Sequence, residues 1–327
     1  MARGEFPPLL TRRGAGGEVP MLEHFHTPVM VAEVLNMLKV TEEGLYMDCT
    51  LGGGGHSQAI LDRGGTVAAM DRDPDAVSYS MERLARYGGR FSAHRSLFSR
   101  IREIAGESAG HFDGVLFDLG ISSRMIDDPS KGFSYRLDGP LLMDMGGGRE
   151  SAYEVVNTRS KNELTHIFKE YGEERKASRI ADAIVKRRSP HPIETTGELA
   201  GIIEAAVGSY LPQKSKARVF QALRMYVNNE LEELQKGLEG ALEILRVGGR
   251  LCVISYHSLE DRLVKRFMKE MSEPCICPPD LPECRCGKKP VLRIVTRKPM
   301  KASEKEAAEN PRAHSALFRA SEKVASV

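Results

Sequence analysis

A run of four glycines directly after an apolar segment is the feature that most constrains this chain. The apolar segment, Leu45–Thr50, has the composition of a strand, and Ser57–Arg63, beyond the glycines, has the pattern of a helix. A strand that turns through glycines into a helix lets a ligand approach the backbone closely, because no Cβ stands in the way. The free N–H groups at the helix start can bind a carboxylate or a phosphate. The sequence therefore predicts an α/β fold with a ligand loop at these glycines.

The residue types around this loop favour an adenosyl ligand over a nicotinamide dinucleotide. Asp71 closes the next strand-like run, Thr66–Met70, where a carboxylate can bind both ribose hydroxyls of a nucleoside. A dinucleotide fingerprint needs a third glycine, and in the two possible registers Ser57 or Gln58 stands there instead. A plain flexible turn is the alternative, which four consecutive glycines after a strand disfavour.

Strand and helix patterns alternate as far as Phe112–Asp118 and again from Glu230 onward, which predicts parallel strands joined by crossover helices. Between these two parts lies a stretch of helical patterns, in which Ser160 to Glu163 and Thr195 to Glu198 have the form of capping boxes. We therefore expect a flexible tail at 1–22, a sheet domain made of 23–126 and 220–327, and an inserted helical subdomain at 127–219.

Several polar or aromatic residues follow predicted strands, where α/β sheets bind their ligands. Asp118 ends an apolar run and is hard to explain as a packing residue, although it could cap the following turn. Phe98 could stack on an adenine ring or belong to the core. Ser255 and His257 follow the fifth strand, where a structural role for the histidine is the alternative.

Composition limits the partners and the cellular compartment that we expect for the protein. The 327 residues are 41% hydrophobic and 28% charged, with a formal net charge of +2, so any nucleic-acid site must come from local charge clusters. We find no apolar run long enough to span a bilayer and no signal-peptide pattern, and we expect a cytoplasmic protein that has no contact with membranes. Cys49 and Cys252 lie in strand-like runs and are expected in the core.

Two groups of basic residues fall in the predicted insertion. Arg175, Arg179 and Lys186 have the spacing of one helix face, and Lys214, Lys216 and Arg218 form a second group. Such groups suit contacts with RNA phosphates, while a solvated helix face is the ordinary alternative.

The remaining four cysteines, Cys275, Cys277, Cys284 and Cys286, crowd into a short proline-rich stretch. Four thiols there could hold zinc. Because the Cys-x-Cys spacing is less usual for structural zinc than Cys-x-x-Cys, no metal site is predicted.

Long motifs across the chain resemble the bacterial family of 16S ribosomal RNA cytosine-N4 methyltransferases. The resemblance covers nearly all of residues 24 to 322. Its motifs are HTPVM from His26, YMDCTLGGGGHS from Tyr46, MDRDPDA from Met70, FDLGISS from Phe117, GFSYRLDGPLLMDM from Gly132, EYGEERKASRIADAIV from Glu170, FQALRMYVNNELEEL from Phe220, GGRLCVISYHSLEDRLVKRF from Gly248 and ENPRAHSALFRA from Glu309.

The resemblance implies a class I methyltransferase fold, Rossmann-like, with an inserted all-helical subdomain that engages the RNA. It also implies S-adenosylmethionine as methyl donor, and as target one cytidine in the decoding region of 16S ribosomal RNA. Recognition of one cytidine among many favours the assembled small subunit as substrate. No obligate protein partner is evident.

Matching the motifs residue by residue carries the family's cofactor contacts to this chain. They fall on Gly54, Gly55 and His56 in the loop, on Asp71 at the ribose, and on Phe98 and Asp118 around the adenosyl group. The family usually has a glutamine where this chain has Met125, and a thioether cannot make the hydrogen bonds of an amide. A second loop, Ser122 to Phe133, also departs from the family at Lys131, where arginine is usual.

For catalysis, Asp118 is the hypothesised acceptor for the cytosine amine, or the residue that orients one, with backbone carbonyls of Leu119–Ser122 assisting. His257 is a candidate for contact with the RNA.

Other classes of function fit less well. A nicotinamide oxidoreductase lacks its fingerprint, and a non-catalytic RNA-binding module leaves the glycine loop and Asp71 unused. A methyltransferase for small molecules or proteins is the nearest rival.

Overall fold

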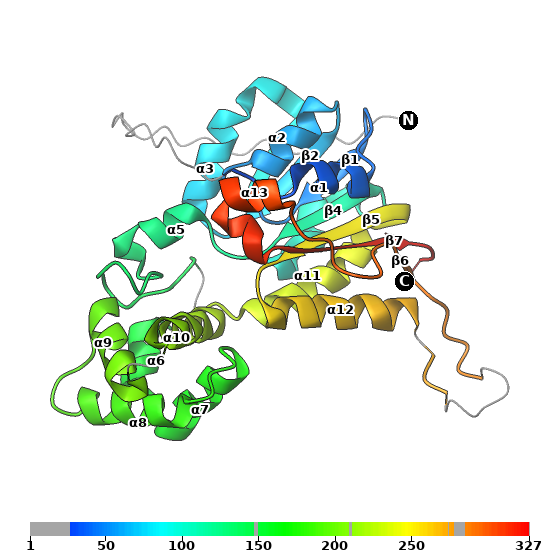
Figure 1. Ribbon diagram of the computed structural model, residues 1–327. Coiled ribbons are helices and arrows are strands. Elements are labelled where there is room, and N and C mark those ends of the chain that lie inside the picture. Colours follow the sequence, from blue (N-terminus) through cyan, green and yellow to red (C-terminus); the bar gives the residue numbers. More distant parts are fainter. Residues whose placement is uncertain (1–26, 147–149, 209–210, 274, 278–284, 327) are drawn as a thin grey trace.

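The computed structural model describes residues 27–146, 150–208, 211–273, 275–277 and 285–326. Within these ranges seven strands form one sheet in the order β3-β2-β1-β4-β5-β7-β6 (Figure 1). The strands are β1 (Leu45–Asp48), β2 (Thr66–Asp71), β3 (Phe91–Arg95), β4 (Phe112–Asp118), β5 (Leu245–Ser255), β6 (Leu292–Ile294) and β7 (Leu317–Lys323). The α/β class I architecture expected from the resemblance is confirmed.

Strand direction divides the sheet into two parts. Strands β1 to β5 pair in parallel, whereas β7 runs antiparallel to both β5 and β6. The alternating pattern predicted the parallel pairing of β1 to β5, and it gave no direction for β6 and β7. Strand order reverses at β1, which lies between β2 and β4, so a crevice is expected at the carboxyl ends of these strands.

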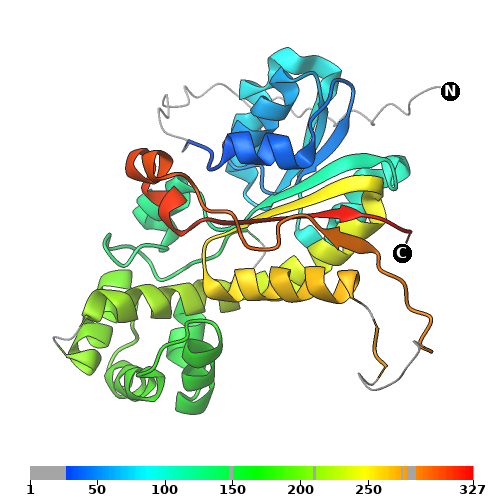
Figure 2. The same cartoon turned by 45° about the vertical axis from the view of Figure 1, so that its right-hand side comes forward.

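Helices cover both faces of the sheet (Figures 1 and 2). Buried side chains alternate along β4, because Val115 and Phe117 pack with α11 and α12 while Leu116 packs with α1 and α2. Cys49 and Cys252 lie in these two cores, as predicted. The helices of this part are α1 (Val31–Leu38), α2 (Gly55–Asp62), α3 (Pro74–Arg83), α4 (Ile101–Ala105), α11 (Glu230–Ile244), α12 (Ser258–Ser272) and α13 (Glu304–Glu309). The 3-10 helices are η1 (Ala85–Arg90), η2 (Phe98–Arg100), η3 (Gly106–Ser108), η4 (Pro129–Lys131) and η5 (Pro311–Ser315).

A group of helices with its own apolar core lies beside the sheet (Figure 1). Both predicted capping boxes are confirmed, at the starts of α7 and α9, because the serine or threonine and the glutamate bond each other's backbone. In α8, Ala177, Ile180, Ala181 and Ile184 are buried at helical spacing. The helices are α5 (Ser123–Asp127), α6 (Ala152–Thr158), α7 (Lys161–Glu170), α8 (Ala177–Arg188), α9 (Thr196–Val207) and α10 (Pro212–Val227).

The junction between the helical group and the sheet lies at the end of α10. This helix runs without a break past residue 219, where the sequence placed a boundary, and Val219, Phe220 and Val227 all pack in the helical core. At its end, the Asn228 side chain donates to the carbonyl of Met143 (2.7 Å) and accepts from the N–H of Met145 (2.9 Å). The division into domains stays a prediction, and a boundary near Asn228 would leave α10 intact.

Candidate active site

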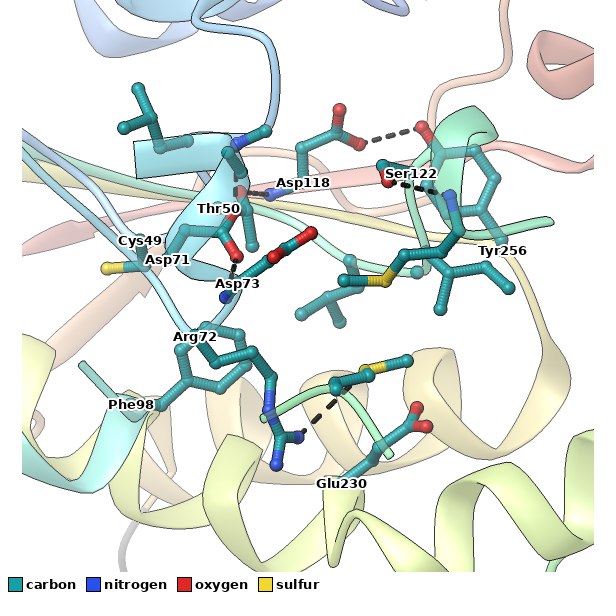
Figure 3. Close-up of a pocket in the computed structure, with 18 of the residues that line it drawn as sticks. Cys49, Thr50, Asp71, Arg72, Asp73, Phe98, Asp118, Ser122, Glu230 and Tyr256 are labelled. Atoms are coloured by element: carbon teal, nitrogen blue, oxygen red, sulfur yellow. Dashed lines mark hydrogen bonds between the residues drawn. The ribbon is translucent and has the colours of Figure 1, made fainter. Parts of the chain in front are cut away.

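A cavity of about 340 Å³ opens at the carboxyl ends of β1, β2, β4 and β5 (Figure 3). This is the edge at which the reversal of strand order predicts a ligand. The cavity is of a size that takes a small ligand. Loop, strand-end and helix residues line it, among them Gly52, Gly53, Gly55, His56, Asp71, Arg72, Phe98, Asp118, Met125, Arg224, Glu230, Tyr256, His257, Glu260 and Arg312.

The glycine loop takes a backbone course that needs glycine. Gly52 (φ +48°) and Gly54 (φ +75°) are in the left-handed region. At Gly55, where α2 begins, a Cβ would come within 2.7 Å of the Pro28 ring. Gly52, Gly53 and Gly55 line the cavity, whereas a Cβ at Gly54 would face Leu84, at 3.0 Å. Gly54 therefore shapes the loop, and its neighbours present their backbone to the cavity.

Asp71, at the end of β2, is tied to this loop. Its Oδ2 accepts a hydrogen bond from the N–H of Gly52 (2.8 Å), and its Oδ1 accepts one from the N–H of Asp73 (2.9 Å). Burial raises the pKa of Asp71 to about 6, against the lowering effect of these two hydrogen bonds. Because burial leaves the charged carboxylate poorly hydrated, two further hydrogen-bond donors, such as the hydroxyls of a ribose, would stabilise it.

The start of the loop is held by another carboxylate, that of Asp48, which is buried. Oδ2 of Asp48 accepts a hydrogen bond from the Ser57 hydroxyl (2.7 Å), and Oδ1 accepts one from the N–H of Thr50 (3.1 Å). Burial raises the pKa of Asp48. Because both bonds lie within the loop and its flanks, Asp48 fixes the path from β1 into α2.

Asp118 ends β4 and is held from three sides. Its Oδ1 accepts a hydrogen bond of 2.7 Å from the Tyr256 hydroxyl, and its N–H donates to the Thr50 hydroxyl at 2.6 Å (Figure 3). Nε2 of buried His56 lies 3.3 Å from Oδ2. Burial lowers the pKa of His56, but the hydrogen bond and charge of Asp118 outweigh burial, so the pKa is raised overall. Burial, with Asp118, also raises the pKa of Tyr256.

A second charged cluster lines the cavity on the side of the helical group. Arg224 of α10 makes two hydrogen bonds to Glu230 of α11, of 2.8 and 2.9 Å. Glu260 of α12 accepts a hydrogen bond from the N–H of Tyr256 (3.0 Å), and Nε2 of His257 lies 3.0 Å from its other oxygen. Burial raises the pKa of Glu260, but His257 and Arg224 lower it further, so the net shift is downward. Opposite charges are thus paired inside the protein, and His257 also caps α12.

Phe98 and Met125 both line the cavity while packing into a core. The Phe98 ring stands edge-on to Phe117, with centroids 5.3 Å apart and an angle of 85° between the planes. Met125 of α5 is buried in the core of the helical group. Each side chain therefore gives the cavity an apolar surface and is held in place by the core behind it.

The predicted RNA-binding residues other than His257 lie outside the cavity lining. Arg179 and Lys186 are exposed on α8, and Lys186 pairs with Asp182 at 2.8 Å. Arg175 is exposed too, but it stands before α8 begins at Ala177, so it does not share that helix face.

The second basic group is also divided. Lys214 is exposed on α10, whereas Lys216 is buried, pairs with Glu204 and is therefore engaged within the protein.

Sequence reasoning missed several residues of the cavity. Tyr256 stands between Ser255 and His257, so its position at the end of β5 was available as a signal. Arg72 follows Asp71 directly and donates to the carbonyl of Asn228 (3.2 Å). Arg224, Glu230 and Arg312 gave no local signal, because they come from helices far along the chain from the glycine loop.

A model of the MraW methylase family matches residues 23–324. The chain belongs to the MraW methylase family. A ribosomal RNA small subunit methyltransferase H from Carboxydothermus hydrogenoformans is 49% identical over 308 residues, which cover 93% of this chain and 99% of that protein. The methyltransferase H of Heliobacterium modesticaldum is 46% identical, over 91% of this chain and 98% of that protein.

Solved structures are more distant from this MraW-family chain. An rRNA methylase from Streptococcus thermophilus has a TM-score of 0.40 and 11% identity, over 88% of this chain and 92% of that one. Family membership therefore rests on sequence.

Among the described residues, no helix combines the length and the apolar character that a membrane span requires.

Proposed function

We propose that this protein transfers a methyl group from S-adenosylmethionine to N4 of one cytidine in the decoding region of 16S ribosomal RNA. The observation that carries the proposal is the lining of one cavity by the glycine loop, Asp71 and Asp118 in a chain of the MraW methylase family. The named relatives, which are ribosomal RNA small subunit methyltransferases, support ribosomal RNA as the substrate.

The cavity fits an adenosyl cofactor at three points. Asp71, whose pKa burial raises to about 6, would accept hydrogen bonds from the ribose hydroxyls. The backbone of Gly52 and Gly53, which no Cβ shields, would lie against the ligand. Phe98 offers an apolar face to the adenine. S-adenosylmethionine supplies an electrophilic methyl group on a sulfonium sulfur.

Asp118 would receive the cytosine amine. The lone pair of that amine is delocalised into the ring, and an acceptor on its N–H helps to localise it at nitrogen and takes up developing positive charge. The Tyr256 hydroxyl occupies one site on Oδ1, and Nε2 of His56 lies 3.3 Å from Oδ2. A second lone pair on each oxygen stays open for the amine. Asp118 would thus hold the amine and accept the proton that it loses, while Tyr256 and His56 fix the orientation of the carboxylate.

The RNA would reach the cavity from the side of the helical group. A base inside a stacked helix cannot enter such a cavity, so the target cytidine would be splayed out of its stack. Arg175, Arg179 and Lys214 are exposed around that group and would bind phosphates. We further propose the assembled small subunit as the substrate and the cytoplasm as the place of action.

The experiment uses purified small subunits that lack the modification. They are incubated with the protein and S-adenosylmethionine that carries a labelled methyl group, and the RNA is digested for nucleoside analysis. The expected product is N4-methylcytidine at one position of the decoding region. A label on another base, on ribose or on a ribosomal protein would overturn the assignment.

The rival proposal is a methyltransferase that acts on small molecules or proteins. The same assay can also compare the components of the subunit as acceptors of the methyl group. Free 16S ribosomal RNA and ribosomal proteins, tested in parallel, should accept less label than the assembled subunit. Equal labelling of free RNA would reject the subunit as the preferred substrate.

A further inference from the structure

Three cysteine side chains converge at the base of the segment that joins α12 to β6. Cys275 and Cys277 follow α12, and Cys286 precedes β6. Their Sγ atoms all lie within 4.8 Å of one another, and those of Cys275 and Cys286 are 3.9 Å apart. The fourth cysteine of the sequence cluster, Cys284, lies outside the described residues.

The spacing of these atoms matches a tetrahedral thiolate site. With zinc–sulfur bonds of about 2.3 Å, two sulfurs on one tetrahedral zinc are about 3.8 Å apart. The separation between Cys275 and Cys286 is close to that value. The backbone N–H of Arg285 donates to Sγ of Cys277 at 3.3 Å, which is the kind of bond that orients a metal-bound thiolate.

We propose that Cys275, Cys277 and Cys286 bind a structural Zn²⁺ ion. In the part of the chain that the structure describes, the group has three members. Three cysteines leave the fourth position of a tetrahedral site to water.

The surroundings indicate a structural role for the ion. None of the three cysteines lines the cavity that holds Asp71 and Asp118. Ile276, between two of the cysteines, is 71% exposed. Because Ile276 adds no apolar burial there, an ion that joins Cys275 and Cys277 to Cys286 would stabilise this part of the chain as a cross-link.

The charge of the neighbouring residues fits the same site. Three thiolates leave a net negative charge on a bound Zn²⁺ ion. Arg285, Lys288 and Lys289 follow or adjoin the last cysteine and would offset it.

The test is metal analysis of the full chain, purified under reducing conditions without chelators. We expect about one zinc per chain, and less than about a tenth of that after each of Cys275→Ser, Cys277→Ser and Cys286→Ser. Replacement of zinc by Co²⁺ should give the near-ultraviolet thiolate band and the visible bands of a tetrahedral site. Cys252→Ala, which removes a thiol from the core, is the matched control and should keep the metal.

Circular dichroism shows whether each serine variant has kept its fold, and the cobalt spectrum of the unmodified chain gives an answer that does not depend on variants. Metal-free protein with no cobalt bands would overturn the site, as would serine variants that keep full zinc. Non-reducing alkylation that finds a disulfide between any two of these cysteines in freshly isolated protein would also overturn it.

Discussion

The Tyr256 hydroxyl donates a hydrogen bond of 2.7 Å to Oδ1 of Asp118, and so joins the ends of β5 and β4 beside the cavity. The two residues are 138 positions apart in the sequence. Because His56 lies 3.3 Å from the other oxygen, the carboxylate is held on both sides. Its orientation is therefore set before any ligand enters the cavity.

Removal of the Tyr256 hydroxyl should slow methyl transfer more than it weakens cofactor binding. Tyr256→Phe leaves the ring and takes away one hydrogen bond to a charged acceptor, so we expect turnover to fall by about ten- to a hundredfold. Affinity for S-adenosylhomocysteine should stay within about twofold, because the hydroxyl bonds Asp118 and not Asp71, the proposed ribose acceptor. Single-turnover kinetics and calorimetry measure the two effects separately.

Asp118→Asn is the companion variant. The amide keeps the shape of the side chain but cannot take up a proton, so turnover should fall at least as far as in Tyr256→Phe. Intact turnover in Asp118→Asn would remove Asp118 from catalysis.

The parts of the fold that the sequence predicted are those that local chemistry determines. The bounds of β4, Phe112–Asp118, agree with the prediction, and both capping boxes formed, because each depends on neighbouring residues. The direction of β7 and the passage of α10 into the helical core depend on distant partners and were not visible in the pattern.

The residues of the site likewise fall into those that the local sequence predicted and those that it did not. Asp71 could be placed at the cavity because it directly follows a strand-like run. Tyr256 was missed because its partner, Asp118, becomes its neighbour only in the folded chain. Arg224 was missed because it meets Glu230 only where α10 gives way to α11. Lys216 appeared in the sequence as one of a basic group, yet it is buried against Glu204.

Cofactor affinity should depend on the ionisation of Asp71. The folded protein without ligand holds the pKa of Asp71 near 6, and ribose hydroxyls prefer the ionised acceptor. Binding should therefore be strongest above pH 7 and should weaken as the pH falls through 6, by about tenfold at pH 5. Calorimetry with S-adenosylhomocysteine across this range measures the slope.

Asp71→Asn is the control for that slope, because His56, whose pKa Asp118 raises, is another titratable group that lines the cavity. The variant should bind more weakly at pH 7 and should lose most of the change between pH 7 and pH 5. If its pH profile keeps the slope of the unmodified protein, another group is responsible.

The start of α2 should not tolerate a methyl group. In Gly55→Ala the new Cβ would come 2.7 to 3.0 Å from three atoms of the Pro28 ring, which cannot rotate away. We expect a loss of about 1–3 kcal/mol in the free energy of unfolding, together with weaker cofactor binding. Gly89→Ala, where a Cβ would meet nothing within 4 Å, should leave both unchanged. Chemical denaturation checks this, and equal stability of the two variants would contradict the packing argument.

Charge on the helical group should govern RNA binding. The triple variant Arg175→Gln, Arg179→Gln and Lys186→Gln removes three exposed positive charges, of which Lys186 is already paired with Asp182. Affinity for the small subunit should fall, and the slope of log K against log salt should flatten by about two. Neutralising Arg63, Arg86 and Arg102, which are exposed outside the helical group, is the matched control and should leave the slope near its original value. Filter binding at several salt concentrations decides the matter, since equal slopes for the triple variant and the unmodified protein would mean that the RNA lies elsewhere.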